Sequence, residues 1–442
     1  MKLPRLLPLA LLLTAAFAQP VLAADLMDVY RDAQAYDAQY ASARAARDAG
    51  VQKLPQGRAG LLPTLGLAAN TTRNDYEATA RATGNKTDAN YNSNAWSLTL
   101  SQPLFRWQNW AGYKQGELAA ASAEAQFVQA SQDLILRVTQ AYFDALLAQE
   151  TLATAKAQKI ATAEQLESAK RNFEVGTSTI TDTHEAQARY DLIVAQEIAA
   201  ENDLAVKRQI LRTLTGKETD NLKSLKTKLQ IGRPQPDDIG QWVASAEGGN
   251  IGIQLAQTAF EIAGREVEKQ RAGHYPTLDL VATHGKAGTG FSSAGGGGSD
   301  SKTSTLGVQL AVPIFAGGAT VARDREAVAL QEKARSDLDN ARRQAALAAR
   351  QAYLGVSAGL AQVKALEAGV TSSQLAVESN KLGYEVGVRI NIDVLNAQSQ
   401  LFDTRQKLAK ARLDTLIAQL RLKSAAGNLS QEDLAAINAL LE

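Results

Sequence analysis

The chain has 442 residues, no cysteine and a formal net charge of +1, with 47 Lys and Arg against 46 Asp and Glu. This balance argues against nucleic acid as a partner, because contacts to phosphates need a basic excess. The missing cysteines exclude disulfides, thiol catalysis and cysteine-ligated zinc, and none of the three histidines has metal-ligand spacing. We therefore expect no enzyme activity, no metal and no cofactor.

The N-terminus has the pattern of a secretory signal peptide. Lys2 and Arg5 precede the apolar stretch 6–17, and Val21-Leu22-Ala23 fits the −3 and −1 positions of a cleavage site. We expect residues 1–23 to be removed and the mature chain to be exported. The apolar stretch is too short to span a bilayer, and no later run of about 18 apolar residues follows. The exported chain is then either soluble or a β-barrel, because only helices and closed barrels satisfy the backbone in lipid.

The mature sequence is internally duplicated. Phe173-Glu174-Val175-Gly176 recurs 211 positions later as Tyr384-Glu385-Val386-Gly387, and Pro63-Thr64-Leu65 recurs as Pro276-Thr277-Leu278. Register held over most of the chain indicates two structural repeats. We expect a first repeat at 24–216, a linker at 217–250, a second repeat at 251–427 and a C-terminal segment at 428–442. Each repeat should contain a helix, two strands and a long helical hairpin.

Each repeat carries two segments in which apolar residues alternate with polar or small ones. These segments are 64–70 and 96–101 in the first repeat, and 277–283 and 305–312 in the second. Period-two alternation predicts strands, and it is the pattern that a barrel needs between lipid and lumen. The stretches between the paired strands, 71–94 and 285–301, are polar and are expected to be connecting links.

Long segments without glycine or proline predict long helices. Residues 117–175 would extend roughly 90 Å as one helix, and 177–215 and 388–426 are further uninterrupted segments. A first helix is expected at about 26–53. Apolar or small residues recur by sevens in the hairpin segments, which indicates coiled-coil packing. The matching stretch of the second repeat holds several glycines, and we expect a continuous helix there that is held by its packing partners; the glycines are Gly355, Gly359, Gly369 and Gly383.

The number of strands constrains the assembly. Four strands cannot close a barrel, because the smallest common barrels have about eight. Open strand edges cannot face lipid, so the chain must oligomerise if these strands cross a membrane. Two chains would supply eight strands and three would supply twelve.

Several segments resemble the TolC-type outer-membrane efflux proteins. They are 386–395, 419–429, the motif His274-Tyr275-Pro276-Thr277-Leu278 and the opening Leu26-Met27-Asp28-Val29-Tyr30. The resemblance implies a homotrimer with a twelve-stranded β-barrel in the lipid of the outer membrane, continued by a long α-helical coiled-coil tunnel in the periplasm. It implies an equatorial region built from the linker and the C-terminal segment. It also implies a passive export duct for proteins (type I secretion) or small toxic compounds, which docks with a periplasmic adaptor and an inner-membrane transporter.

The same resemblance assigns a gate at the periplasmic end of the tunnel. Thr181 and Asp182 match the acceptor side of the closing network, and Tyr384 and Arg389 match the donor side. Asp393 matches the carboxylate ring at the narrowest point, where three copies would meet and favour cations. Asn396 stands where the best-known members carry a second Asp, so the constriction is expected to be less acidic.

Other interpretations of these residues remain open. Asp182 and Asp393 each follow a glycine-containing turn and could be helix N-caps, and Gly176 and Gly387 fit the C′ position after a helix. The aromatic cluster after the second strand fits either core packing or a membrane-interface belt; its members are Phe105, Trp107, Trp110 and Tyr113. The alternative function is a soluble periplasmic coiled-coil scaffold or adaptor, against which the four alternating segments argue.

Overall fold

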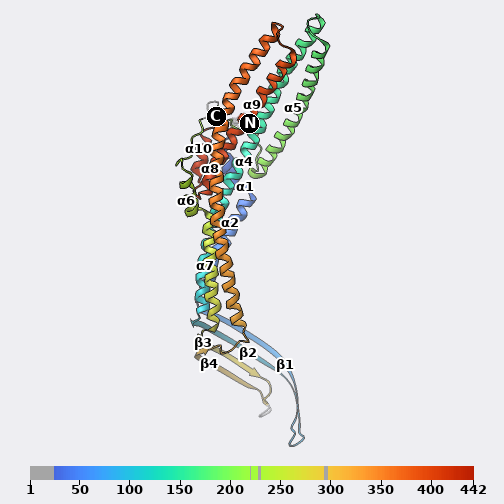
Figure 1. The fold of residues 1–442 in the computed structure, drawn as a ribbon. Coiled ribbons are helices and arrows are strands. Elements are labelled where there is room, and N and C mark those ends of the chain that lie inside the picture. Colours follow the sequence, from blue (N-terminus) through green and yellow to red (C-terminus); the bar gives the residue numbers. More distant parts are fainter. Residues whose placement is uncertain (1–23, 220, 227–229, 293–296) are drawn as a thin grey trace, which may run out of the picture. The chain divides into compact units, whose positions relative to one another are not determined.

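The computed structural model describes residues 24–219, 221–226, 230–292 and 297–442 (Figure 1). The expected signal peptide, 1–23, lies outside the described residues. The chain divides into two compact units, each built from segments distant in sequence. The first comprises the described residues of Met1–Ser42, Gln129–Asn250 and Ala345–Glu442, and the second comprises Ala43–Val128 with the described residues of Ile251–Gln344.

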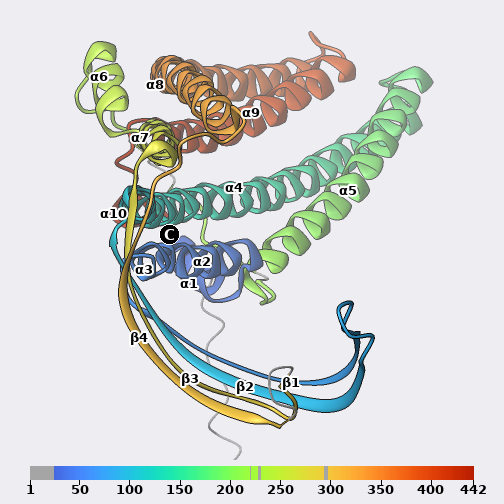
Figure 2. The ribbon, with the colours of Figure 1, turned by 90° about the horizontal axis from the view of Figure 1, so that it is seen from below.

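The second unit contains an antiparallel sheet with the strand order β1-β2-β3-β4, which is visibly curved in Figure 2. The strands are β1 (Thr64–Thr79), β2 (Lys86–Phe105), β3 (Thr277–Thr289) and β4 (Ser299–Ala311). All four predicted strands are present. The prediction that 71–94 is a connecting link was wrong, because most of it extends β1 and β2. There, polar side chains pair across the ladder, as in the 2.6 Å hydrogen bond from Thr71 to Asn94, so the strands continue without apolar alternation.

The two faces of the sheet differ in chemistry. Residues paired across antiparallel strands share a face, and the register aligns Leu67 with Leu98 and Leu280 with Val308. This apolar face is bare, and Leu306 keeps 76% of its surface exposed. The opposite face carries hydroxyls and small groups, such as Thr99 and its partner Thr283. The alternation in the sequence therefore becomes a sheet with one exposed apolar face.

Helices of the second unit pack closely together near the sheet. They are α3 (Lys53–Ala59), α7 (Ile251–Arg271), the 3-10 turn η1 (Ala272–His274), most of α2 (Ala38–Val51) and the first parts of α4 (Trp107–Glu174) and α8 (Ala319–Glu385). A Cβ on Gly116 would lie 2.6 Å from the carbonyl oxygen of Lys53, so this glycine allows α3 and α4 to approach. Gln115 joins α4 to α7 through a 2.8 Å hydrogen bond to Glu266.

The first unit holds the helical hairpins. It contains α1 (Leu26–Tyr36), α5 (Ile180–Thr215), α6 (Ile239–Gly249), α9 (Asn391–Ala425), α10 (Gln431–Asn438) and the later parts of α4 and α8. As predicted, α8 runs unbroken through its glycines. Gly359 has a structural reason, because a Cβ there would lie 2.4 Å from the hydroxyl oxygen of Thr415 on α9. In the part of the chain that the structure describes, no helix is long and apolar enough to cross a bilayer.

The single helix expected at 26–53 is instead divided into α1, α2 and the start of α3. The first break falls at Asp37, whose backbone is extended. Its carboxylate accepts a hydrogen bond from the backbone amide of Tyr40 and two more from the guanidinium of Arg137. Burial opposes ionisation of Asp37, but these hydrogen bonds outweigh it and hold the pKa of the carboxyl below its usual value. A tertiary ion pair thus ends α1, which local sequence does not reveal.

Segments from both ends of the described chain meet the linker in one place. The Asn438 side-chain oxygen accepts the backbone amides of Leu26 and Met27, and the Tyr142 hydroxyl lies 3.1 and 3.0 Å from the carbonyl oxygens of Ala24 and Lys223. Further backbone hydrogen bonds join the linker to the tail, at Lys226–Leu440 and Ser224–Glu442. The last helix begins with a capping box formed by Ser430 and Asp433. We call this set of contacts the terminal junction.

Candidate functional site

The two helical hairpins turn in the same way and at the same end of the first unit (Figure 1). Gly176 follows α4 and Gly387 follows α8, with φ of +76° and +75°. The left-handed backbone after a helix favours glycine, so both predicted C′ positions are confirmed. The amides of Thr177 and Val388 then bond back to the carbonyls of Asn172 and Gly383. These turns fix where α5 and α9 begin.

Asp182 lies in the first turn of α5 and is not its N-cap. The N-cap is Thr179, whose hydroxyl accepts the Asp182 amide while the Asp182 carboxylate accepts the Thr179 amide at 3.0 Å. This capping box satisfies two backbone donors that the helix start leaves free. The N-cap interpretation of Asp182 was therefore wrong in position, although its carboxylate does stabilise the helix start.

Asp393 is in the equivalent place on α9, and it is not an N-cap either. The N-cap residue of α9 is Ile390, and Asp393 lies three residues later. Its carboxylate lies 3.6 Å from the Arg389 guanidinium, in a pair that is largely solvent-exposed. An exposed pair of this kind contributes about 1 kcal/mol or less. Asn396, one turn further, accepts a 2.9 Å hydrogen bond from Arg189 on α5.

The structure brings most of the predicted gate residues to one cavity. This cavity, of about 830 Å³, is lined by Asp182, Tyr384 and Arg389 together with other polar residues from the two hairpin ends. In the described residues, no hydrogen bond or ion pair connects Asp182 with Tyr384 or Arg389. Tyr384 instead accepts a 3.0 Å hydrogen bond from the side-chain amide of Asn172. Thr181 is exposed on the first turn of α5.

Asn391 is a residue that sequence reasoning missed. It is the first residue of α9 and is fully buried, with 0% exposure. Its side-chain oxygen accepts a hydrogen bond from Gln165 on α4, and its side-chain nitrogen donates to the backbone carbonyl of Asp182 at 3.3 Å. One buried amide therefore joins α9 to both helices of the other hairpin. A polar residue at a buried coiled-coil position is the signal that could have identified it.

Apolar packing continues from this buried amide along the hairpins. Leu395 on α9 packs with Leu166 and Ala169 on α4 and with Ala186 on α5. These side chains are nearly fully buried, and Ile392 and Tyr190 cover them. The polar contacts therefore occupy the last turns of the hairpins, with an apolar cluster next to them.

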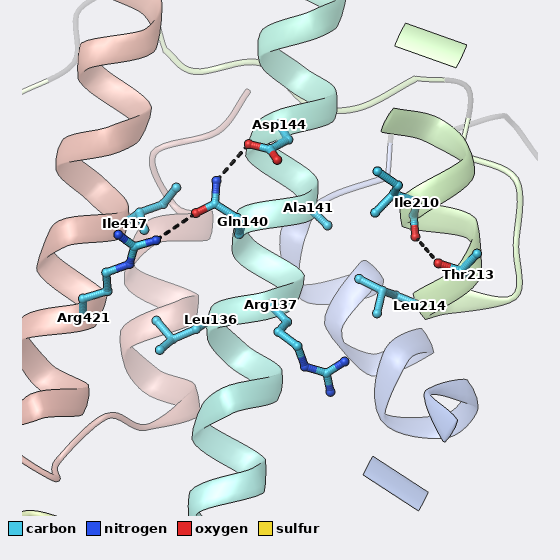
Figure 3. Close-up of a pocket in the computed structure, with 10 residues that line it drawn as sticks. All are labelled: Leu136, Arg137, Gln140, Ala141, Asp144, Ile210, Thr213, Leu214, Ile417 and Arg421. Atoms are coloured by element: carbon cyan, nitrogen blue, oxygen red, sulfur yellow. Dashed lines mark hydrogen bonds between the residues drawn. The ribbon is translucent and has the colours of Figure 1, made fainter. Parts of the chain in front are cut away.

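A second cavity in the first unit, of about 490 Å³, lies where α4, α5 and α9 approach one another (Figure 3). Its walls are mainly apolar, from Leu136, Ile210, Leu214 and Ile417, and no sequence prediction falls on it. Gln140 crosses one side, donating to Asp144 at 2.8 Å and accepting from Arg421 at 3.2 Å. In the described ranges, no group of three or more His, Asp or Glu residues is placed to hold a metal ion.

The aromatic cluster at the end of β2 is exposed. Phe105, Trp107 and Trp110 each keep about two fifths of their surface open, at 43%, 40% and 43%. The Lys114 ammonium lies 5.3 Å from the ring centroids of both Trp110 and Tyr113. Phe105, Trp107 and Trp110 are thus not buried in a core of this chain, whereas Tyr113 is half-buried beside Trp110. An interface belt stays a prediction.

Comparison with known proteins identifies the class. The model of the family described as outer membrane efflux protein matches residues 29–217 and 242–428. The alkaline protease secretion protein AprF of Pseudomonas aeruginosa is 35% identical over 418 residues, covering 94% of this chain and 86% of AprF. The outer membrane protein TolC of Escherichia coli K12 is 32% identical over 448 residues, covering 99% of this chain and 89% of TolC.

Solved structures agree on the fold. The Campylobacter jejuni CmeC outer membrane channel superposes with a TM-score of 0.79 at 18% identity, covering 94% of this chain and 90% of CmeC. The Vibrio cholerae outer membrane protein VceC superposes with a TM-score of 0.77 at 19% identity, covering 91% and 96%. The fold is therefore that of outer-membrane channels with a helical portion.

The sequence and fold together define a transport protein of the outer membrane. The chain belongs to the outer membrane efflux protein family. It is an export duct and not an enzyme, and family membership sets aside the soluble scaffold that the sequence left open.

Proposed function

We propose that three copies of the chain form a twelve-stranded barrel in outer-membrane lipid, continued by a helical tunnel into the periplasm. The observation that carries this is the sheet, whose apolar face is bare and whose outer strands β1 and β4 each have an open edge. Closure with other copies satisfies those edges, which lipid cannot do. The exposed leucines then face the hydrocarbon.

Cargo is assigned from the named relatives. AprF is an alkaline protease secretion protein, and PrtF of Dickeya chrysanthemi, 33% identical over 434 residues, is a proteases secretion protein. We propose that the chain exports proteins by type I secretion and can also release small toxic compounds. Like these secretion relatives, it would work with an inner-membrane transporter and a periplasmic adaptor.

The linker and the C-terminal segment form an equatorial region in this proposal. Support comes from the terminal junction, in which 221–226 is hydrogen-bonded both to the N-terminal segment and to the tail. We propose the five segments with the bounds expected from sequence: 1–23, 24–216, 217–250, 251–427 and 428–442. The terminal junction would hold the helices of each copy together while their ends at the hairpin turns move.

The gate lies at the hairpin turns. Thr181, Asp182, Tyr384 and Arg389 form its network in the trimer, and the shared cavity that three of them line supports this placement. Within one chain these groups bond to other partners, so the closing contacts of Asp182 are assigned to a neighbouring copy. Asp393 and Asn396 would form the constriction, and replacing Asp393 with Ala should lower cation selectivity.

Single-channel conductance in planar bilayers tests the duct and its gate. Wild-type protein should give small steps, and the Tyr384→Phe, Arg389→Ser double variant should give larger ones, because the donors that hold the hairpins are gone. The control is Lys410→Gln, which removes a cation from an exposed pair on α9 far from the turn. Equal steps in wild type and double variant would remove both residues from the gate. Absence of any conductance from inserted protein would contradict the duct itself.

A further inference from the structure

On the apolar face of the sheet, residues paired across neighbouring strands form rows, and the chemistry of these rows changes along the strands. Leu100, Ala282 and Leu306 form one row across β2, β3 and β4. The next row toward the β3–β4 connection is Leu98, His284 and Ser304, and the row after that is Trp96, Lys286 and Lys302. Along one face, the chemistry therefore changes from apolar to mixed to cationic within three rows.

The cationic row places two like charges directly opposite each other. Lys286 and Lys302 are paired residues on adjacent antiparallel strands, an arrangement that is unfavourable by itself. Lys286 has a partner in Asp300, at 2.8 Å, whose side chain lies across Gly288. Lys302 has no ion-pair partner in the described residues. One carboxylate, bound by Lys286, thus stands beside two ammonium groups, and an additional anion between the lysines would relieve the repulsion.

The surroundings of the two lysines suit the boundary of a membrane. Trp96 stands in the same row, and its indole contacts the His284 ring edge-on at 5.6 Å. Tryptophan is enriched at such boundaries because one end is apolar and the other polar. From Leu278, at the helix end of β3, to Lys286 the strand rises roughly 26 Å, or about 20 Å along the normal at a typical barrel tilt. That height approximates the apolar band of an outer-membrane barrel.

From these rows we propose that Lys286 and Lys302 bind a phosphate group of the lipid in the outer leaflet. This inference rests on the barrel proposed above, in which the leucine face contacts lipid. The row that contains the two lysines lies at the end of the strands away from the helices, so it faces the leaflet opposite the periplasm. Lysines on edge strands can also deter unwanted pairing, but Lys286 lies on β3, which is paired on both sides. A phosphate between the two ammonium groups explains both residues together.

Native mass spectrometry of the purified full chain tests the site. The probes are bisphosphorylated lipid A and the same lipid without its phosphates. Lys286→Gln combined with Lys302→Gln should weaken binding of the phosphorylated lipid by roughly tenfold or more, since each lysine near an anionic surface contributes several-fold. Lys286→Arg combined with Lys302→Arg should retain binding. The matched control, Lys333→Gln with Lys410→Gln, removes equal charge from exposed helix positions and should change nothing.

The outcomes separate this inference from the function on which it rests. Equal binding of phosphorylated lipid to wild type and to the Gln pair would overturn the site, as would equal binding of both lipids to wild type. Conductance in planar bilayers should be the same for wild type and the Gln pair. Wild-type protein that neither inserts nor conducts would overturn the proposed duct instead.

Discussion

Asn391→Leu should open the gate by removing the buried amide that joins the two hairpins. The substitution keeps a similar volume but leaves the Gln165 side-chain amide without its partner. It also removes one of the two hydrogen bonds at the Asp182 carbonyl, which still accepts a backbone amide within α5. An unpaired buried group costs about 1–3 kcal/mol. Gln165 is only half-buried and can turn to water, so the loss lies in the lower part of this range, at about 1–2 kcal/mol. These contacts join hairpins that must separate for the tunnel to widen. Their loss therefore destabilises the closed state relative to the open state.

At about 1.4 kcal/mol for each factor of ten, this loss shifts the closed-to-open ratio of one copy by roughly 5- to 30-fold. Single-channel recordings should then show longer or larger openings. The control is Asn380→Leu, because the side chain of Asn380 bonds only to the carbonyl of Ala376 on its own helix. Thermal unfolding should be measured in parallel to show that both variants are folded. Unchanged openings in a folded Asn391→Leu protein would refute the reasoning.

Three further predictions concern stability and insertion. Asp37→Asn should destabilise the chain by about 2–4 kcal/mol by breaking a largely buried ion pair. Because folding lowers the pKa of Asp37, the ion pair stabilises the fold above the unfolded pKa, and this stabilisation is lost as pH falls through the folded pKa. Thermal unfolding measured between pH 7 and pH 3 would detect the loss. Gly359→Ala should lower stability by about 1–3 kcal/mol through overpacking, whereas Gly355→Ala, with open space at its Cβ, should not; equal melting temperatures would contradict this. Val308→Arg should cost about 2–4 kcal/mol of membrane stability, and Gln309→Arg on the other face much less; equal insertion of both into liposomes would show that the lipid-facing side is wrongly assigned.

The strands and long helices follow from local pattern. Alternation alone predicts the parts of β1 to β4 that have an apolar face, and the absence of glycine and proline predicts much of α4, α5 and α9. The extension of β1 and β2 beyond that face was missed, because Thr and Asn side chains stabilise it by pairing across the ladder. A residue-by-residue pattern does not contain that information.

Features set by contacts distant in sequence were the hardest to predict. The break at Asp37 depends on Arg137, a hundred positions away. Asn391 was missed because its partners, Gln165 and Asp182, come from the other repeat, 226 and 209 positions away. The family resemblance located the hairpin turns and placed Asp182, Tyr384 and Arg389 near one another. It did not predict the partners that these side chains have within a single chain.

The terminal junction has a consequence for the order in which the protein matures. Asn438 holds the start of α1 across 412 positions, and Tyr142 stands between that start and the linker. A chain that crosses the inner membrane from its N-terminus must therefore wait for its last helix before these contacts at the start of α1 can form. Contacts of such long range form late and slowly. The exposed leucines of the sheet must stay shielded during that interval, so maturation of this protein depends on help that keeps an unfinished chain from aggregating.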